Sequence, residues 1–213
     1  MTSARDHIFE KIDHGAAPTL CTTEPWSTEL MVPAYTRQPQ SVLIDMFIEK
    51  ILATRGQIDV LATVADVPSH VARIVSNTGL DESVVVSDLL ENLPWAGSGI
   101  KRTVLDLSRD GIIAVTDCFA GVAETGTIVT LNNGGRDSRL NYVSAYHIVV
   151  LDVSAIVGPY EDVWHRMAEA DIAVPRAVNF ITGPSRTADI EQTIELGAHG
   201  PGKLHILLVN PAA

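Results

Sequence analysis

The chain has 213 residues, of which 46% are hydrophobic and 19% charged, a composition typical of folded globular proteins and not of disordered ones. Its formal net charge is −11, from 26 acidic and 15 basic residues, so no basic stripe is present to bind nucleic acid. The apolar runs are too short to span a bilayer and the first residues lack a signal-peptide layout, so we expect a cytoplasmic protein with no membrane partner.

The cysteine and histidine content limits the metal chemistry of this chain. Only Cys21 and Cys118 are present, whereas an iron–sulfur cluster is normally held by about four thiolates. No Cys-x-x-Cys, His-x-His or His-x-x-x-His pair occurs. We therefore expect no metal or cofactor in this chain, and we interpret Cys118, at the end of an apolar run, as a small buried hydrophobe.

The first 40 residues differ in texture from the rest of the chain. Apolar spacing predicts a helix over residues 2–15, and residues 16–40 contain four prolines, which favour an extended arm. An arm that packs on the body or on a second copy of the chain, and a simple tether, fit this segment equally well. We therefore predict an N-terminal region over residues 1–40 and one α/β domain over residues 41–213.

From residue 41 onward, apolar residues alternate between helical and strand spacing. Helices are predicted for residues 42–52, 69–77, 137–145 and 160–170. Strands are predicted for residues 58–64, 83–87, 111–116, 127–131, 147–153 and 178–181. Residues 87–94 are typical of a turn or short helix, and residues 101–107 are ambiguous. Strands that are apolar on both faces and alternate with helices predict a three-layer α/β/α fold around a mainly parallel sheet.

The last part of the chain predicts a strand, a turn, a helix and a second strand. Pro184 stops the first strand, Asp189 and Glu191 suit the first turn of a helix, and Gly197 ends it. The turn in between is rich in hydroxyl groups and has the chemistry of an anion-binding loop. We expect this loop to lie at the carboxyl edge of the sheet, where open α/β sheets bind ligands.

Two groups of residues could carry chemistry at that edge. Asp117 and Glu124 follow apolar strands, and a buried carboxylate is costly unless it is hydrogen-bonded or used. Glu124 could serve as a general base, nucleophile or ligand, or it could brace its turn by accepting backbone N–H bonds. The loop after residue 182 could hold a carboxylate or phosphate, or its side chains could simply cap a helix. His199 could donate to a substrate oxygen, whereas His205 alternates with apolar neighbours and is more typical of a structural residue.

The chain resembles the LutC/YkgG family, which is defined by the lactate-utilisation (LUD) domain. The resemblance rests on residues 123–127 (AETGT), 178–191 (VNFITGPSRTADIE) and 197–205 (GAHGPGKLH), and extends from about residue 41 to 209. It implies a NagB/RpiA/CoA-transferase-like fold and a role in oxidising L-lactate to pyruvate beside partners that carry iron–sulfur clusters. A small carboxylate ligand and a second copy of the chain are further candidate partners.

The candidate site combines the residue chemistry with the resemblance. The candidate catalytic residues are Glu124 and Asp117. The candidate ligand-binding residues are Thr125, Gly126, Thr127, Gly183, Pro184, Ser185, Arg186, Thr187, Asp189, His199 and Gly200.

Three functional hypotheses follow. The leading one is a subunit or accessory protein of an iron–sulfur-dependent lactate-oxidising system. The alternative is a free-standing enzyme that uses Glu124, either CoA-transferase-like or 5-formyltetrahydrofolate cyclo-ligase-like. The second of these would need a nucleotide-binding motif, and no Walker loop or Gly-x-Gly-x-x-Gly helix start is present. A scaffold with a vestigial pocket is the third.

Overall fold

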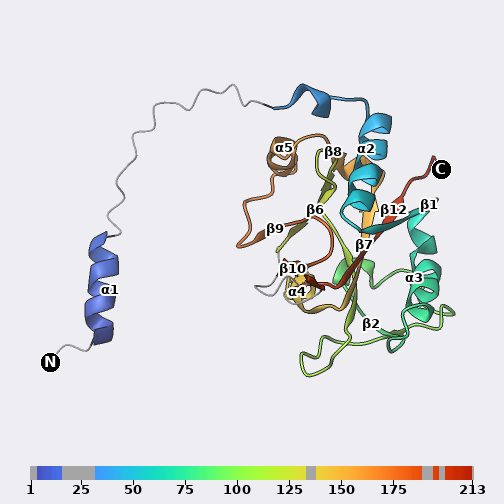
Figure 1. The fold of residues 1–213 in the computed structure, drawn as a ribbon, viewed down its shortest axis with the longest axis horizontal. Coiled ribbons are helices and arrows are strands. Elements are labelled where there is room, and N and C mark those ends of the chain that lie inside the picture. The colour runs from blue at the N-terminus through green and yellow to red at the C-terminus, as the bar shows by residue number, and fades with distance from the viewer. Residues whose placement is uncertain (1–3, 16–31, 133–137, 189–193, 197–199, 213) are drawn as a thin grey trace. The chain divides into compact units, whose positions relative to one another are not determined.

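The computed structural model describes residues 4–15, 32–132, 138–188, 194–196 and 200–212 (Figure 1). The chain divides into two compact units, Met1–Met31 and Val32–Ala213. The first contains helix α1 (Ala4–Gly15), which confirms the helix predicted there. The second unit includes Pro33 and Pro39, which directly precede the 3-10 helix η1 and helix α2.

The second unit contains all the other described elements. Its helices are η1 (Ala34–Thr36), α2 (Gln40–Ala53), η2 (Val64–Asp66), α3 (Val67–Ser76), η3 (Asp88–Leu90), α4 (Leu140–Val143), η4 (Val153–Ala155) and α5 (Glu161–Glu169). Its strands are β1 (Gln57–Leu61), β2 (Ser83–Val86), β3 (Lys101–Arg102), β4 (Ile113–Asp117), β5 (Ala120–Val122), β6 (Thr127–Leu131), β7 (Tyr146–Asp152), β8 (Ile156–Val157), β9 (Val178–Ile181), β10 (Arg186–Ala188), β11 (Ile194–Leu196) and β12 (Lys203–Val209).

The centre of the fold is a six-stranded sheet with the order β1-β12-β7-β4-β2-β3. Every pair of neighbouring strands in it is parallel. The inner strands β12, β7, β4 and β2 are buried on both faces, so their side chains alternate between two separate cores. Leu207 of β12 belongs to the core beneath α3, whereas Ile206 and Leu208 belong to the core beneath α2. The predicted α/β fold with a mainly parallel sheet is confirmed.

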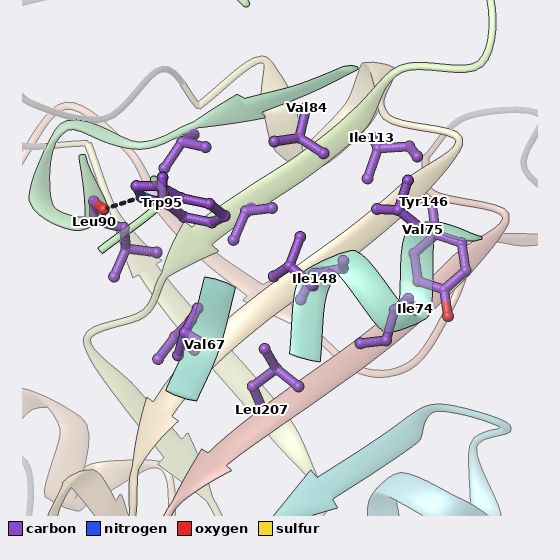
Figure 2. Packing of buried hydrophobic residues seen from close by; sticks show 14 of the residues in the cluster. Val67, Ile74, Val75, Val84, Leu90, Trp95, Ile113, Tyr146, Ile148 and Leu207 are labelled. Carbon is purple, nitrogen blue, oxygen red and sulfur yellow. Dashed lines mark hydrogen bonds between the residues drawn. The ribbon is translucent and has the colours of Figure 1, made fainter. Parts of the chain in front are cut away.

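Helix α3 covers one face of this sheet (Figure 2). Val67, Val71 and Val75 lie four residues apart, so they share one side of the helix, and all three are buried against the strands. Trp95 closes one end of this core and donates its indole N–H to the carbonyl of Leu90 at 2.9 Å. The bond satisfies the polar atom of an otherwise apolar side chain.

Helix α2 covers the other face, because Leu43, Phe47 and Ile51 also recur every four residues and are buried. The helix ends at Ala53 with Thr54 as its C-cap, and Arg55 takes the left-handed conformation with φ of 65°. The left-handed residue is therefore this arginine and not Gly56, which follows it. Only this short connection separates α2 from β1, so the last turn of α2 lies at the amino edge of the sheet.

A second sheet, which the sequence did not predict as a separate unit, joins α2 on this face. Its strand order is β8-β5-β6-β9, with β5 antiparallel to β6 and β6 antiparallel to β9. Ile128 and Ile156 face the core beneath α2, while Val129 and Leu131 face Val163 of α5. The sheet therefore lies between α2 and α5.

The helix predicted after Pro184 is wrong. Residues 186–188 form β10, which pairs antiparallel with β11 at residues 194–196. The strand before it, β9, belongs to the second sheet and not to the parallel one. Acidic residues at 189 and 191 suit a helix start, but a helix cannot contain two strands that pair with each other, so tertiary pairing overrides the local signal. Residues 189–193 lie outside the described residues.

Candidate functional site

The Glu-Thr-Gly-Thr turn joins β5 to β6 and carries a cluster of hydroxyl groups. The Thr127 hydroxyl lies 2.7 Å from that of Thr125 and 2.6 Å from that of Thr182. The Tyr160 hydroxyl lies 2.8 Å from both Thr125 and Thr127. Because β9 pairs with β6, the residue that follows β9, Thr182, is brought opposite Thr127. The hydroxyls satisfy one another in a part-buried chain.

Two glycines bring this turn and the Gly-Pro-Ser loop against the end of α2. Both Gly126 (φ 68°) and Gly183 (φ 79°) are left-handed. A Cβ at Gly126 would lie 2.7 Å from the backbone of Ile51, and one at Gly183 would lie 2.9 Å from the Thr54 carbonyl oxygen. The predicted approach of the two segments is confirmed, but the predicted edge is wrong, because α2 ends at the amino edge of the parallel sheet.

Glu124 is half-buried beside this cluster. Its backbone N–H donates to the carbonyl of Gly158 at 3.2 Å, which anchors the turn to the residue after β8. The Tyr35 hydroxyl, from η1, lies 3.5 Å from its Oε1 in an exposed position. The carboxylate is therefore open to solvent and could contact a ligand or a partner.

Asp117 lies elsewhere. It is the last residue of β4, at the carboxyl edge of the parallel sheet, and accepts a 3.0 Å hydrogen bond from the Ser87 hydroxyl. The turn that carries Glu124 contacts the end of α2 at the opposite edge, so the structure does not bring the two candidate catalytic carboxylates into one site. Next to Asp117, burial raises the pKa of the Cys118 thiol to about 12, in keeping with a small buried hydrophobe.

The Gly-Pro-Ser loop is held by backbone and side-chain contacts at the amino edge. The Ser185 N–H donates to the carbonyl of Pro201 at 2.8 Å, and Gly200 packs on the Ser185 side chain. Arg186 donates to the carbonyl of Thr54 at 2.6 Å. Pro184 lines a cavity of about 210 Å³. For Thr187 only the backbone, in β10, is described, and Asp189 and His199 lie outside the described residues.

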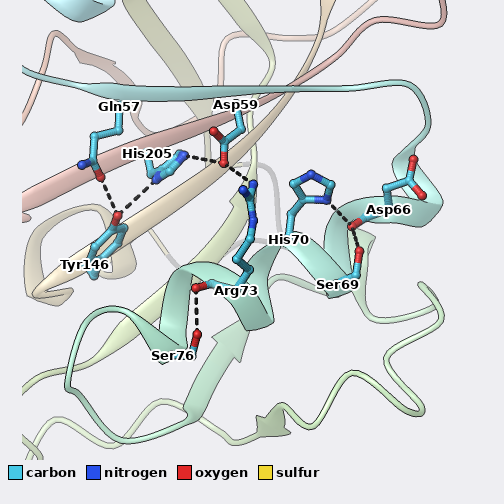
Figure 3. A network of polar contacts seen from close by, with 9 residues as sticks. All are labelled: Gln57, Asp59, Asp66, Ser69, His70, Arg73, Ser76, Tyr146 and His205. Atoms are coloured by element: carbon cyan, nitrogen blue, oxygen red, sulfur yellow. Dashed lines mark hydrogen bonds and ion pairs between the residues drawn. The ribbon is translucent and has the colours of Figure 1, made fainter.

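A polar network that the sequence did not single out lies beside this loop, where β1, β7 and β12 begin (Figure 3). The Tyr146 hydroxyl donates to Gln57 Oε1 at 2.6 Å and lies 3.1 Å from His205 Nδ1. On the far side of the ring, His205 Nε2 lies 3.3 Å from Asp59 Oδ2, within ion-pair range but out of line for a hydrogen bond. Arg73 of α3 donates to the same Asp59 oxygen at 2.9 Å.

Burial determines the protonation of this network. It lowers the pKa of His205, against the opposing effect of the Asp59 carboxylate. Burial, together with Asp59, also raises the pKa of the Tyr146 phenol. Both rings are therefore held neutral near pH 7, and Tyr146 can donate to Gln57.

The shifted pKa of His205 predicts a loss of stability in mild acid. In the unfolded chain, histidine takes up a proton below about pH 6.5, while the folded ring stays neutral to lower pH. The unfolded state then binds more protons, so the free energy of unfolding should fall as the pH drops below about 6.5 and level off beneath the folded pKa. Urea denaturation from pH 7.5 to 5 measures this slope.

His205→Gln should flatten that slope, and His165→Gln, at a surface histidine of α5, serves as the control. An equal acid slope in the His205→Gln protein would show that other groups cause the loss.

The sequence did contain a signal for the network. Gln57 and Asp59 alternate with apolar residues, as do Lys203 and His205, and these strands pair with Gln57 opposite His205.

The described residues contain no group of three or more His, Cys, Asp or Glu side chains placed to hold a metal ion. Among the described helices, none is both long and apolar enough to cross a membrane.

Comparison with known proteins finds similarity to proteins with a LUD domain. The model of the LUD domain matches residues 108–209. Lactate utilization protein C of Exiguobacterium sp. is 30% identical over 144 residues, which cover 66% of this chain and 63% of that protein. Lactate utilization protein C of Anoxybacillus flavithermus is 35% identical over 108 residues, 51% of this chain and 48% of that protein. The chain thus spans 48% to 63% of the length of these two curated relatives.

A solved structure supports the fold. The crystal structure of a DUF162 family protein from Deinococcus radiodurans has a TM-score of 0.59 and 19% sequence identity. The likeness covers 81% of this chain and 99% of that one, and at this identity it shows the fold alone. The LUD-domain match over residues 108–209, with the similarity to the lactate utilization protein C relatives, supports a LUD-domain protein of the lactate utilization protein C family.

Proposed function

We propose that the protein works in lactate utilisation, as a subunit or accessory protein of a cytoplasmic system that oxidises L-lactate to pyruvate. The observation that carries the proposal is the similarity to lactate utilization protein C, which extends over 144 residues. The LUD-domain match, over residues 108–209, includes the Glu-Thr-Gly-Thr turn and the Gly-Pro-Ser loop. These two segments meet at the end of α2, where Glu124 and Arg186 are accessible. They would form the contact surface for a small carboxylate or a partner protein.

The proposal assigns iron–sulfur clusters to partner proteins. Clusters are held by thiolates. Cys118 is partly buried, and desolvation of its thiol raises the pKa to about 12, which makes it a poor thiolate ligand. Cys21 lies outside the described residues. A partner that supplies the redox centre would leave this chain the task of binding substrate or organising the assembly.

Growth on L-lactate tests the proposal. Deleting the gene should abolish or strongly slow growth on L-lactate and leave growth on glucose unchanged, and the full-length chain should restore it. The tagged chain should also co-purify with an iron–sulfur protein from lactate-grown cells. Normal growth of the deletion strain on L-lactate would refute the proposal.

A CoA-transferase-like role for Glu124 is the second candidate, because its carboxylate is half exposed at the end of a hairpin. In such a reaction the carboxylate attacks the thioester carbonyl of an acyl-CoA, the acyl C–S bond breaks and CoA leaves as the thiolate, which leaves a mixed acyl-glutamyl anhydride on the protein. Incubation with a panel of acyl-CoAs, followed by mass spectrometry, would detect an adduct on Glu124 and its loss in Glu124→Gln. No adduct with any of the acyl-CoAs would eliminate this candidate.

A further inference from the structure

The network around His205 lines a cavity of about 220 Å³ between α3 and the amino ends of β1, β7 and β12. The polar side chains around it that matter here are Gln57, Asp59, Arg73, Tyr146, Lys203 and His205. A neighbouring cavity of about 210 Å³ shares Gln57 and Lys203 and reaches Pro184 of the Gly-Pro-Ser loop. The Gly-Pro-Ser loop therefore lies next to a polar recess that neither the sequence nor the family match assigns.

The charges around the cavity favour a single negative charge. Arg73 and Lys203 contribute two positive charges, Asp59 contributes one negative charge, and His205 is neutral near pH 7. Within the described residues no carboxylate pairs with the Lys203 ammonium, which lies 5.7 Å from the centre of the Tyr146 ring. The lining thus keeps a net charge of about +1 in a protein whose total charge is −11.

The hydrogen-bonding groups are arranged for a second polar atom of a ligand. Tyr146 and His205 are 5% and 8% exposed, so their polar atoms are fixed by packing and by each other. Nε2 of His205 is buried and makes no aligned hydrogen bond. The Asp59 carboxylate lies 3.3 Å from this atom, so the charge of Asp59 acts directly on the Tyr146–His205 pair.

We propose that this cavity binds a small monocarboxylate that carries a hydroxyl or keto oxygen beside its carboxyl group, with Arg73 and Lys203 on the carboxylate. The Tyr146–His205 pair contacts the adjacent oxygen. The choice of carboxylate rests on the proposed function, because lactate and pyruvate both have this form. A phosphate monoester carries nearly two negative charges at neutral pH, which one net positive charge balances poorly.

Calorimetric titration of the full-length protein with L-lactate, pyruvate, acetate, inorganic phosphate and chloride tests the site. We expect saturable binding of L-lactate and pyruvate, weaker binding of acetate, and the weakest binding of phosphate and chloride. Removing a charge-assisted hydrogen bond typically weakens binding by about tenfold or more. Arg73→Gln and Lys203→Gln should each show such a loss, while Arg176→Gln, at an exposed arginine after α5, should bind as the wild type does.

Asp59→Asn separates binding chemistry from folding. It removes the opposing negative charge and frees Arg73, so the affinity for L-lactate should rise severalfold. If the substitutions instead weakened binding by disrupting the fold around the cavity, every variant, Asp59→Asn included, would lose affinity. The Arg73 side chain is 60% exposed and Lys203 is exposed, so neither change disturbs the core.

The proposal fails if the wild type shows no saturable binding, if phosphate or chloride binds as well as L-lactate, or if Asp59→Asn weakens binding. If the protein binds L-lactate but deletion of its gene leaves growth on lactate normal, the proposed function is refuted and the site stands. If the protein restores growth on lactate but binds no carboxylate, the site is refuted and the proposed function stands.

Discussion

Phe47→Ala is expected to lower the free energy of unfolding by about 3–5 kcal/mol, the usual cost of deleting a buried aromatic ring. Phe47 is fully buried in the middle of α2. Its ring also packs against the second sheet, because a Cβ at Gly121 of β5 would come within 3.0 Å of it. The cavity left by the ring would therefore lie where α2 meets both sheets. Urea denaturation, followed by circular dichroism, measures the loss.

Leu52→Ala is the matched control for Phe47→Ala. Leu52 lies on the same helix but is 55% exposed, so its truncation should cost less than about 1 kcal/mol. If the two variants lose similar amounts, the second sheet must relax onto α2 and fill the space, and the rigid three-way contact described above would be wrong.

Gly126→Ala should lower the free energy of unfolding by about 2–5 kcal/mol. The left-handed backbone at φ 68° costs a non-glycine residue about 1–2 kcal/mol. The new Cβ would also lie 2.7 Å from backbone atoms of Lys50 and Ile51, which cannot rotate away as a side chain could, and overpacking typically costs about 1–3 kcal/mol more. Thermal unfolding of the purified variant measures the sum.

Gly97→Ala isolates the backbone part of that cost. Gly97 has φ of 88°, yet a Cβ there would meet no atom within 4 Å. Its substitution should cost only about 1–2 kcal/mol. Equal losses at Gly97 and Gly126 would mean that the turn moves freely away from α2, so that the position of Glu124 is not set by this contact.

Most of the parallel sheet could be predicted from the sequence because its signals are local. Residues 84–86 and 148–151 are runs of apolar, largely β-branched residues, and α2 and α3 repeat their buried residues every three or four positions. The partition into two sheets could not be predicted in this way. Strands β6 and β9 have the same apolar texture as the parallel strands, and only long-range pairing decides which sheet they join.

The candidate site could be predicted only in part, because some of its residues lie in recognisable segments and others come together only through long-range strand pairing. The sequence predicted that the Glu-Thr-Gly-Thr turn and the Gly-Pro-Ser loop face one another, and the two segments do meet, with the Thr127 and Thr182 hydroxyls 2.6 Å apart. The network around His205 was missed because its residues come from three strands and one helix, and each looks like an isolated polar residue in an apolar run. The register that places Gln57 opposite His205, and Tyr146 opposite Lys203, is a property of the assembled sheet alone.

The sheet order has a consequence for how the chain folds during synthesis. The last strand, β12, lies between β1 and β7. Strand β1 pairs with β12 alone, so it has no neighbour in the sheet until residue 209 has left the ribosome. Until then the edges of β1 and β7 that pair with β12 are open. Unpaired strand edges of this kind favour aggregation. A nascent chain stalled before β12 should remain protease-sensitive, and acquire resistance only when that strand emerges.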